Sequence, residues 1–173
     1  MSRSRKTTRS VAHAAVFGAL ALVFLYLGNA VPTGRWGVAA LAGLMPAGAI
    51  ISGGLFSGML CWLGVTGLGL LLIPDKLLVL LFGLLFGLYA VVKSLVERQR
   101  KRPAEYFWKL VFFNLAFTAV FLLMKAAVLA SLPAALGAVW MLYGVGNVVF
   151  LVYDYGFSKL IALYVARIYK ASR

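Results

Sequence analysis

Long apolar blocks alternate with short polar connections along nearly the whole chain. Six blocks are separated by glycine, proline and serine breaks, such as Ser52-Gly53-Gly54 and Ser131-Leu132-Pro133, or by basic residues. Most blocks are close to the length of about 20 residues that a helix needs to cross a bilayer. The pattern predicts an all-α, polytopic membrane protein, a six-transmembrane-helix bundle with helices at about 11–31, 37–51, 54–73, 77–93, 107–130 and 136–165.

The second block is the shortest of the six. Residues 37–51 would cover only about 22 Å at the helical rise of 1.5 Å per residue, and Pro46 lies within them. A short or kinked crossing is one reading, and a re-entrant segment shielded by its neighbours is the other. We expect a crossing, because a re-entrant segment would move the basic residues after the fourth helix to the outside.

The composition leads to the same class. The hydrophobic fraction is 64% and the mean hydropathy is +0.98, and a soluble domain of 173 residues could not hide that much apolar surface. We expect a single integral membrane domain over residues 1–173. The basic start followed by an apolar block resembles a signal peptide, but the block is longer than the apolar core of such peptides, so we expect an uncleaved first helix.

The formal charge of +13 is collected in three places: the N-terminus 1–10, the loop 94–106 and the end of the chain. Short loops rich in lysine and arginine stay on the cytoplasmic side. We therefore expect both termini and this loop to be cytoplasmic, in a bacterial inner or plasma membrane. Because the clusters flank apolar spans, we expect their partners to be anionic lipid headgroups and not nucleic acid.

Two ionisable residues fall at the same depth in the predicted bundle. Lys93 on the fourth helix and Asp154 on the sixth both lie near the inner boundary, and an unpaired charge there is costly. We predict an ion pair between them. It would serve either to neutralise both charges or as a coupling element that opens and closes, and Tyr89, Tyr153 and Tyr155 would supply hydroxyl groups to it.

A second set of polar and aromatic residues is expected near the outer surface. One interpretation is an outward pocket for a small anionic or zwitterionic ring compound. The other is that the tryptophans anchor the helices at the interface, the lysine reaches the headgroups and the asparagines bond across helices, as we also expect of Asn114. The residues are Asn29, Arg35, Trp36, Lys125, Trp140, Tyr143 and Asn147.

Small residues at four-residue spacing, such as Ala15 and Ala19, allow helices to approach closely, either within the bundle or against another membrane protein. Signatures of catalysis are missing from the sequence. It has one histidine, one cysteine, four dispersed acidic residues and no G-x-x-x-x-G-K-[ST] loop. We expect no enzyme activity, no catalytic residues, no metal site and no cofactor, and any active transport would draw its energy from another subunit.

This layout resembles the S component of energy-coupling factor transporters, a substrate-binding membrane subunit. The features that carry the resemblance are six helices, both ends inside, a basic first helix with Ala15-x-x-x-Ala19 and no nucleotide site. The resemblance implies capture of a vitamin-like small molecule, and association with a membrane coupling subunit and an ATPase pair through Ala15 and Ala19. The run Phe86-Gly87-Leu88-Tyr89, followed by Lys93-Ser94-Leu95-Val96-Glu97, also resembles small uncharacterised bacterial membrane proteins.

Three functions follow as alternatives. A substrate-capture subunit predicts a closed outer pocket lined by Asn29, Lys125 and Asn147. A membrane scaffold or assembly partner predicts no pocket and small-residue faces that are exposed to lipid. A lipid-binding membrane protein predicts a groove that opens sideways to the bilayer.

Overall fold

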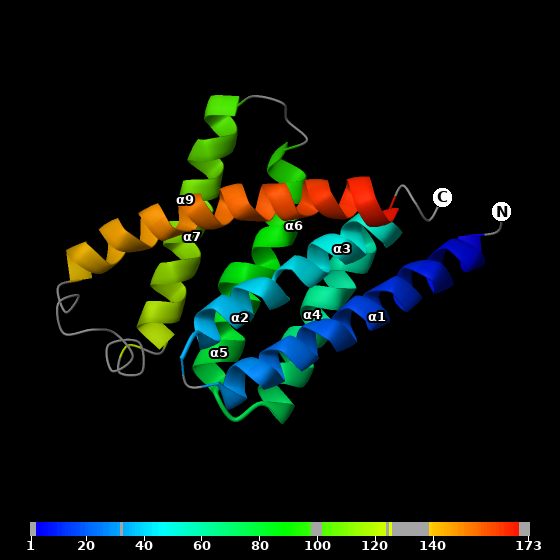
Figure 1. The fold of residues 1–173 in the computed structure, drawn as a ribbon, viewed down its shortest axis with the longest axis horizontal. Coiled ribbons are helices and arrows are strands. Elements are labelled where there is room, and N and C mark those ends of the chain that lie inside the picture. Colours follow the sequence, from blue (N-terminus) through cyan, green and yellow to red (C-terminus); the bar gives the residue numbers. More distant parts are fainter. Residues whose placement is uncertain (1–2, 32, 98–101, 124, 126–138, 170–173) are drawn as a thin grey trace.

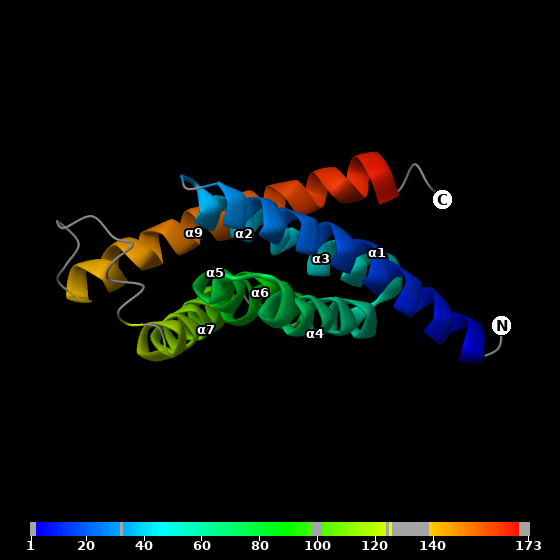
Figure 2. The same ribbon diagram turned by 90° about the horizontal axis from the view of Figure 1, so that it is seen from below.

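Two layers of helices make up the fold. The computed structural model describes residues 3–31, 33–97, 102–123, 125 and 139–169, and every regular element among them is helical. Figure 2 shows the layers edge-on. One layer contains α1 (Arg3–Ala30), α2 (Arg35–Ala42), α3 (Leu44–Gly53) and α9 (Val139–Tyr164), which continues into η4 (Val165–Tyr169). The other contains α4 (Leu55–Leu72), α5 (Lys76–Leu80), η1 (Leu81–Phe86), α6 (Gly87–Val96) and α7 (Arg102–Leu123).

Among the described residues, six helical segments are long and apolar enough to cross a membrane. They are Thr7–Ala30, Arg35–Gly53, Leu55–Leu72, Lys76–Val96, Ala104–Leu123 and Trp140–Arg167. The shortest has 18 residues, which is about 27 Å at the helical rise and close to the thickness of a hydrocarbon core. The prediction of an all-helical chain with six such helices is confirmed.

The two ends of the described chain lie on the same side of the molecule. The first turns of α1 and the last turns of η4 lie toward the same end of the longest axis (Figure 1), although they are separated there (Figure 2). The α2–α3 helices run back along this axis, whereas α4, α6 and α7 cross it at a steep angle (Figure 1). An even number of passes through the bundle has this consequence.

The second segment is longer than its apolar block. It begins at Arg35 and ends at Gly53, which gives 19 residues and about 28 Å of helix. Gly43 joins α2 to α3 with helical backbone angles, and its N–H donates to the Ala39 carbonyl. Pro46 falls in the first turn of α3, where a missing N–H costs little. The segment is therefore long enough to cross, and Gly54, with a φ of +87°, ends it.

Several helices extend beyond the predicted boundaries because polar residues continue the helix outside the apolar block. The first helix begins at Arg3 instead of residue 11, and the fifth begins at Arg102 instead of residue 107. Hydropathy marks the part of a helix that fits hydrocarbon, not the end of its hydrogen bonding. The predicted turn at 131–133, the end of the fifth helix at 126–130 and the start of the sixth at 136–138 lie outside the described residues.

A π-helical turn interrupts the fourth segment. In η1 the Gly87 N–H donates to the Phe82 carbonyl, five residues back, instead of to the Gly83 carbonyl. The Trp62 indole N–H of α4 donates to that Gly83 carbonyl at 2.7 Å. A neighbouring helix therefore replaces the hydrogen bond that the wider turn removes, which is a condition for such turns in apolar surroundings.

Candidate functional site

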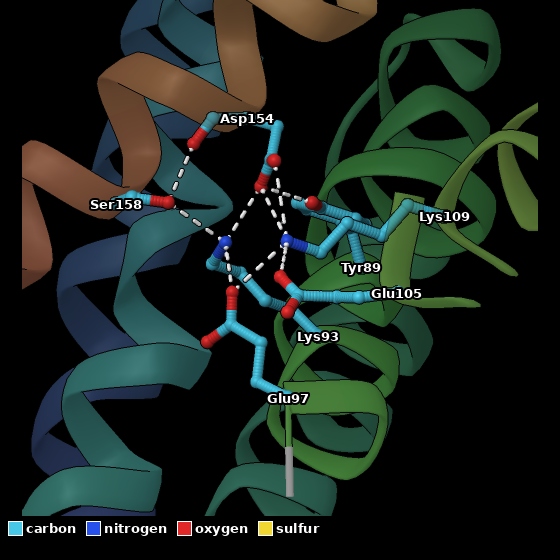
Figure 3. Close-up of polar contacts among 7 residues, drawn as sticks. All are labelled: Tyr89, Lys93, Glu97, Glu105, Lys109, Asp154 and Ser158. Atoms are coloured by element: carbon cyan, nitrogen blue, oxygen red, sulfur yellow. Dashed lines mark hydrogen bonds and ion pairs between the residues drawn. The ribbon is translucent and has the colours of Figure 1, made fainter. Parts of the chain in front are cut away.

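Three helices bring ionised side chains together near the end of α6. Each helix contributes two residues four positions apart, which places both on one face. Lys93 and Glu97 come from α6 and the residue that follows it, Glu105 and Lys109 from α7, and Asp154 and Ser158 from α9. Figure 3 shows the six side chains, with Tyr89, pointing toward one another where α9 crosses α6 and α7. We refer to these seven residues as the charge cluster.

The Lys93 ammonium is bonded on all sides. Its Nζ lies 2.6 Å from Asp154 Oδ1, 2.5 Å from Glu97 Oε1 and 2.8 Å from Ser158 Oγ. An ammonium has three N–H groups, so each has an acceptor. Only 3% of the Lys93 side chain is exposed. A buried ammonium is tolerated in apolar surroundings when it is paired and hydrogen-bonded, as this one is.

Lys109 approaches the same carboxylate from α7. Its Nζ lies 2.6 Å from Glu105 Oε1, 3.0 Å from Glu97 Oε1 and 3.2 Å from Asp154 Oδ2. The Tyr89 hydroxyl donates to Asp154 Oδ1. Asp154 therefore connects α9 to both α6 and α7.

The formal charges of the charge cluster do not sum to zero. Two ammonium groups face three carboxylates, which leaves a formal charge of −1. The chain has four acidic residues in all, so three of them converge here. The fourth, Asp75, pairs with Arg35 at 3.0 Å near the opposite end of the bundle.

Glu97 lies just beyond the fourth apolar segment and is the most exposed carboxylate of the cluster. Burial raises the pKa of its carboxyl, but the hydrogen bonds and charges of Lys93 and Lys109 outweigh this and hold the pKa below its ordinary value of 4.5. The ionised Glu97 carboxylate therefore contributes its full stabilisation above pH 4.5. This stabilisation is lost as the pH falls through the lowered pKa of the folded protein.

A cavity of about 240 Å³ lies next to the charge cluster, between η1, α7 and α9. Among the thirteen described residues that line it, none is charged. Seven are aromatic: Trp36 of α2, Phe86 of η1, Tyr89 of α6, Phe113 and Phe117 of α7, and Phe150 and Tyr153 of α9. We refer to this cavity as the aromatic pocket.

Tyr89 belongs to both features. Its ring lines the aromatic pocket and packs edge-on against Phe150, with centroids 5.1 Å apart. Its hydroxyl lies in the charge cluster. The side chain is 1% exposed, so it separates the apolar cavity from the ionised groups.

The structure brings the predicted pair, Lys93 and Asp154, together, and Tyr89 with them. Tyr153 instead points its hydroxyl at the Ala40 carbonyl, 3.3 Å away, and Tyr155 is exposed. Sequence reasoning missed Lys109, Glu97 and Glu105, because it placed the two glutamates in the loop 94–106 and counted Lys109, at the start of the fifth helix, among the basic residues around that loop. The i,i+4 spacing of Glu105 and Lys109 was the available signal that they share a helix face.

The residues expected to form an outward pocket lie in separate places. Asn29 accepts a hydrogen bond from the Asp75 N–H at 3.3 Å, next to the Arg35–Asp75 pair. Asn147 exchanges hydrogen bonds with Asn114, at 2.9 and 3.1 Å. These two amides therefore bond to protein groups at two separate places in the bundle.

The remaining members of that set differ from one another. Tyr143 shares a hydrogen bond of 2.7 Å with Thr118, also between α7 and α9. Lys125 and Trp140 are exposed. Trp36 alone lines the aromatic pocket.

The two small residues of the first helix face outward. Ala15 and Ala19 are exposed, whereas Ala14 and Gly18 on the neighbouring face are buried. Gly18 lies against Val65 and Cys61 of α4. The Ala14–Gly18 face thus packs within the bundle, and the Ala15–Ala19 face is open to lipid or to another helix.

Comparison of the chain with family models, curated proteins and solved structures finds no match.

Proposed function

We propose that this protein is an integral membrane protein that captures a hydrophobic small molecule from the bilayer and holds it in the aromatic pocket. The observation that carries the proposal is the lining: thirteen residues from helices far apart in sequence, with no charge among them. A cavity with such walls favours apolar over ionic ligands. The predicted capture role is kept, and the expected anionic or zwitterionic ligand is replaced by an apolar one.

A binding role fits the pocket better than a catalytic one. General acid–base or nucleophilic chemistry needs an oriented, reactive side chain within reach of the ligand. The ionised groups nearest to the aromatic pocket, Lys93 and Asp154, are both bonded within the charge cluster. The Tyr89 hydroxyl is bonded there too.

We also propose the finer topology that the charges favour. Both termini and the loop 94–106 would lie on the cytoplasmic side of a bacterial plasma membrane, because lysine and arginine are retained there. The position of the start of α1 and the end of η4 toward the same end of the molecule in Figure 1 supports the part of this arrangement that concerns the two termini. The exposed Ala15–Ala19 face is then the proposed contact for an energy-supplying membrane subunit, as the resemblance to S components implies.

Ligand-induced stabilisation tests the binding role. Cys61 is the single cysteine and is 2% exposed, so a thiol-reactive fluorophore reports the unfolding of the purified protein in detergent. Decanol and 2-naphthalenemethanol are the probes. At saturation we expect at least one of them to raise the midpoint of thermal unfolding by about 3–5 °C, since a ligand that binds only the folded state stabilises it.

Two glycines of α9 provide a matched pair of variants. Gly146 lines the aromatic pocket, and a side chain there would lie against the Phe113 ring. Gly144 has open space beside it. The shift should disappear in Gly146→Leu and persist in Gly144→Leu. Equal shifts in all three proteins would place the probe elsewhere and refute the proposal.

A further inference from the structure

The walls of the aromatic pocket are themselves ordered as a stack. Phe113 lies at their centre. The centroids of the Phe113 and Phe150 rings are 4.6 Å apart, with an interplanar angle of 17°. The centroids of the Phe113 and Phe117 rings are 5.6 Å apart, with an interplanar angle of 21°. Tyr89 meets Phe150 edge-on. Both geometries are those that aromatic rings prefer with one another.

These walls are held in place before any ligand enters. Phe113, Phe150 and Tyr89 are 7%, 5% and 1% exposed, and Tyr89 is fixed at its far end by the hydrogen bond to Asp154. Buried rings in contact with several neighbours cannot collapse into the cavity without losing those contacts. The pocket therefore offers a rigid shape to its ligand.

The size and polarity of the cavity narrow the choice of ligand. Its volume of about 240 Å³ is below the range of about 300–1,000 Å³ for sites of drug-sized ligands. It fits one compact group and not a whole lipid. The absence of charged groups among the described lining residues excludes a ligand whose charge would be buried there, because an unpaired charge is not stable in such surroundings.

Building on the proposed binding role, we propose that the group held in the aromatic pocket is a neutral, planar ring system of one or two fused rings, and not a saturated acyl chain. A planar ring packs against the aromatic walls, Phe113 among them, either stacked or edge-on, and has no internal rotations to lose on binding. A saturated chain gains only apolar contact and loses rotational freedom for each bond that is fixed.

The two probes named above separate these ligand classes. Decanol and 2-naphthalenemethanol both carry one hydroxyl group, and they differ in planarity. We expect 2-naphthalenemethanol to produce its half-maximal stabilisation at a concentration at least tenfold lower than decanol does, after correction for partition of both probes into detergent.

Variants of α7 provide the control for stacking. Phe113→Leu should reduce the advantage of the ring probe to less than about threefold, because leucine fills space but removes the central ring of the aromatic wall. Phe112→Leu alters a ring that stacks on Tyr89 but does not line the aromatic pocket, and it should keep the tenfold preference. A Phe150→Leu variant replaces Phe113→Leu if the latter fails to fold.

The results with the two probes distinguish failure of the ring proposal from failure of the proposed binding role. Equal or stronger stabilisation by decanol would overturn the ring proposal and leave the binding role intact. Stabilisation by neither probe in the wild-type protein would overturn the proposed function itself. A ring preference that survives in both Phe113→Leu and Phe150→Leu would place the ring site outside the aromatic pocket and overturn the inference.

Discussion

Lys93→Met should destabilise the protein more than Asp154→Asn does. The charge cluster already has a carboxylate in excess, and loss of Lys93 leaves three carboxylates around one ammonium. Removing one partner of a buried ion pair costs about 3–5 kcal/mol. Asp154→Asn brings the formal charge to zero and keeps an oxygen acceptor, so we expect a cost of about 1–3 kcal/mol. Thermal unfolding followed at Cys61 gives the comparison.

The double variant is the sharper test of the cluster. Lys93→Met with Asp154→Asn restores the formal charge of −1 and should be at least as stable as Lys93→Met alone. Lys125→Met is the matched control, because its side chain is exposed and the cost should stay within about 0.5 kcal/mol. Strictly additive losses in the double variant would show that the two residues do not interact.

Gly43→Ala should cost about 2–3 kcal/mol or more, and the cause is steric. A Cβ at this position would lie 2.7 Å from the Phe86 Cβ and 2.9 Å from the Phe86 backbone carbon and oxygen. A side-chain rotation cannot relieve a clash with backbone, so η1 must move away from the α2–α3 junction, and such overpacking is destabilising. Because Phe86 lines the aromatic pocket, binding of 2-naphthalenemethanol should weaken as well. The thermal unfolding midpoint at Cys61, with and without this probe, measures both effects.

A glycine-to-alanine change in α4 serves as the control, because it alters helix propensity without a steric clash. Gly64 is helical, and a Cβ there meets no atom within 4 Å. Gly64→Ala should be neutral or stabilising by about 0.5–1 kcal/mol, since alanine favours helix over glycine. Similar losses in Gly43→Ala and Gly64→Ala would contradict the close approach of η1.

Hydropathy was sufficient to predict the helices because a helix that is to cross hydrocarbon needs an apolar block of about the same length in every case. Depth along straight helices was likewise sufficient to match Lys93 with Asp154. Counting 1.5 Å per residue from each end places both at the same level whichever way the helices pack. The helix positions and the Lys93–Asp154 match both depend only on distance counted along the helices.

The side-chain contacts and the pocket depend on how each helix is rotated and which helices are its neighbours, and hydropathy does not determine either. Because Asn29 and Asn147 have similar depths, they were expected either to share a pocket or to bond across helices. Asn29 bonds to the Asp75 N–H and Asn147 to Asn114. The π-helical turn depends on Trp62, some twenty residues away in sequence, as the donor to Gly83. Among the seven aromatic residues of the pocket, Trp36, Tyr89 and Tyr153 were assigned to other sites from the sequence, and the four phenylalanines were assigned to none.

The most direct test of the aromatic pocket as a ligand site is the chemical content of the purified protein. Wild type, Gly144→Leu and Gly146→Leu are purified in the same detergent, extracted with organic solvent and compared by mass spectrometry. We expect a hydrophobic compound that is retained by wild type and Gly144→Leu, in an amount close to that of the protein, and is lost from Gly146→Leu. Extracts with the same content from all three proteins would contradict it.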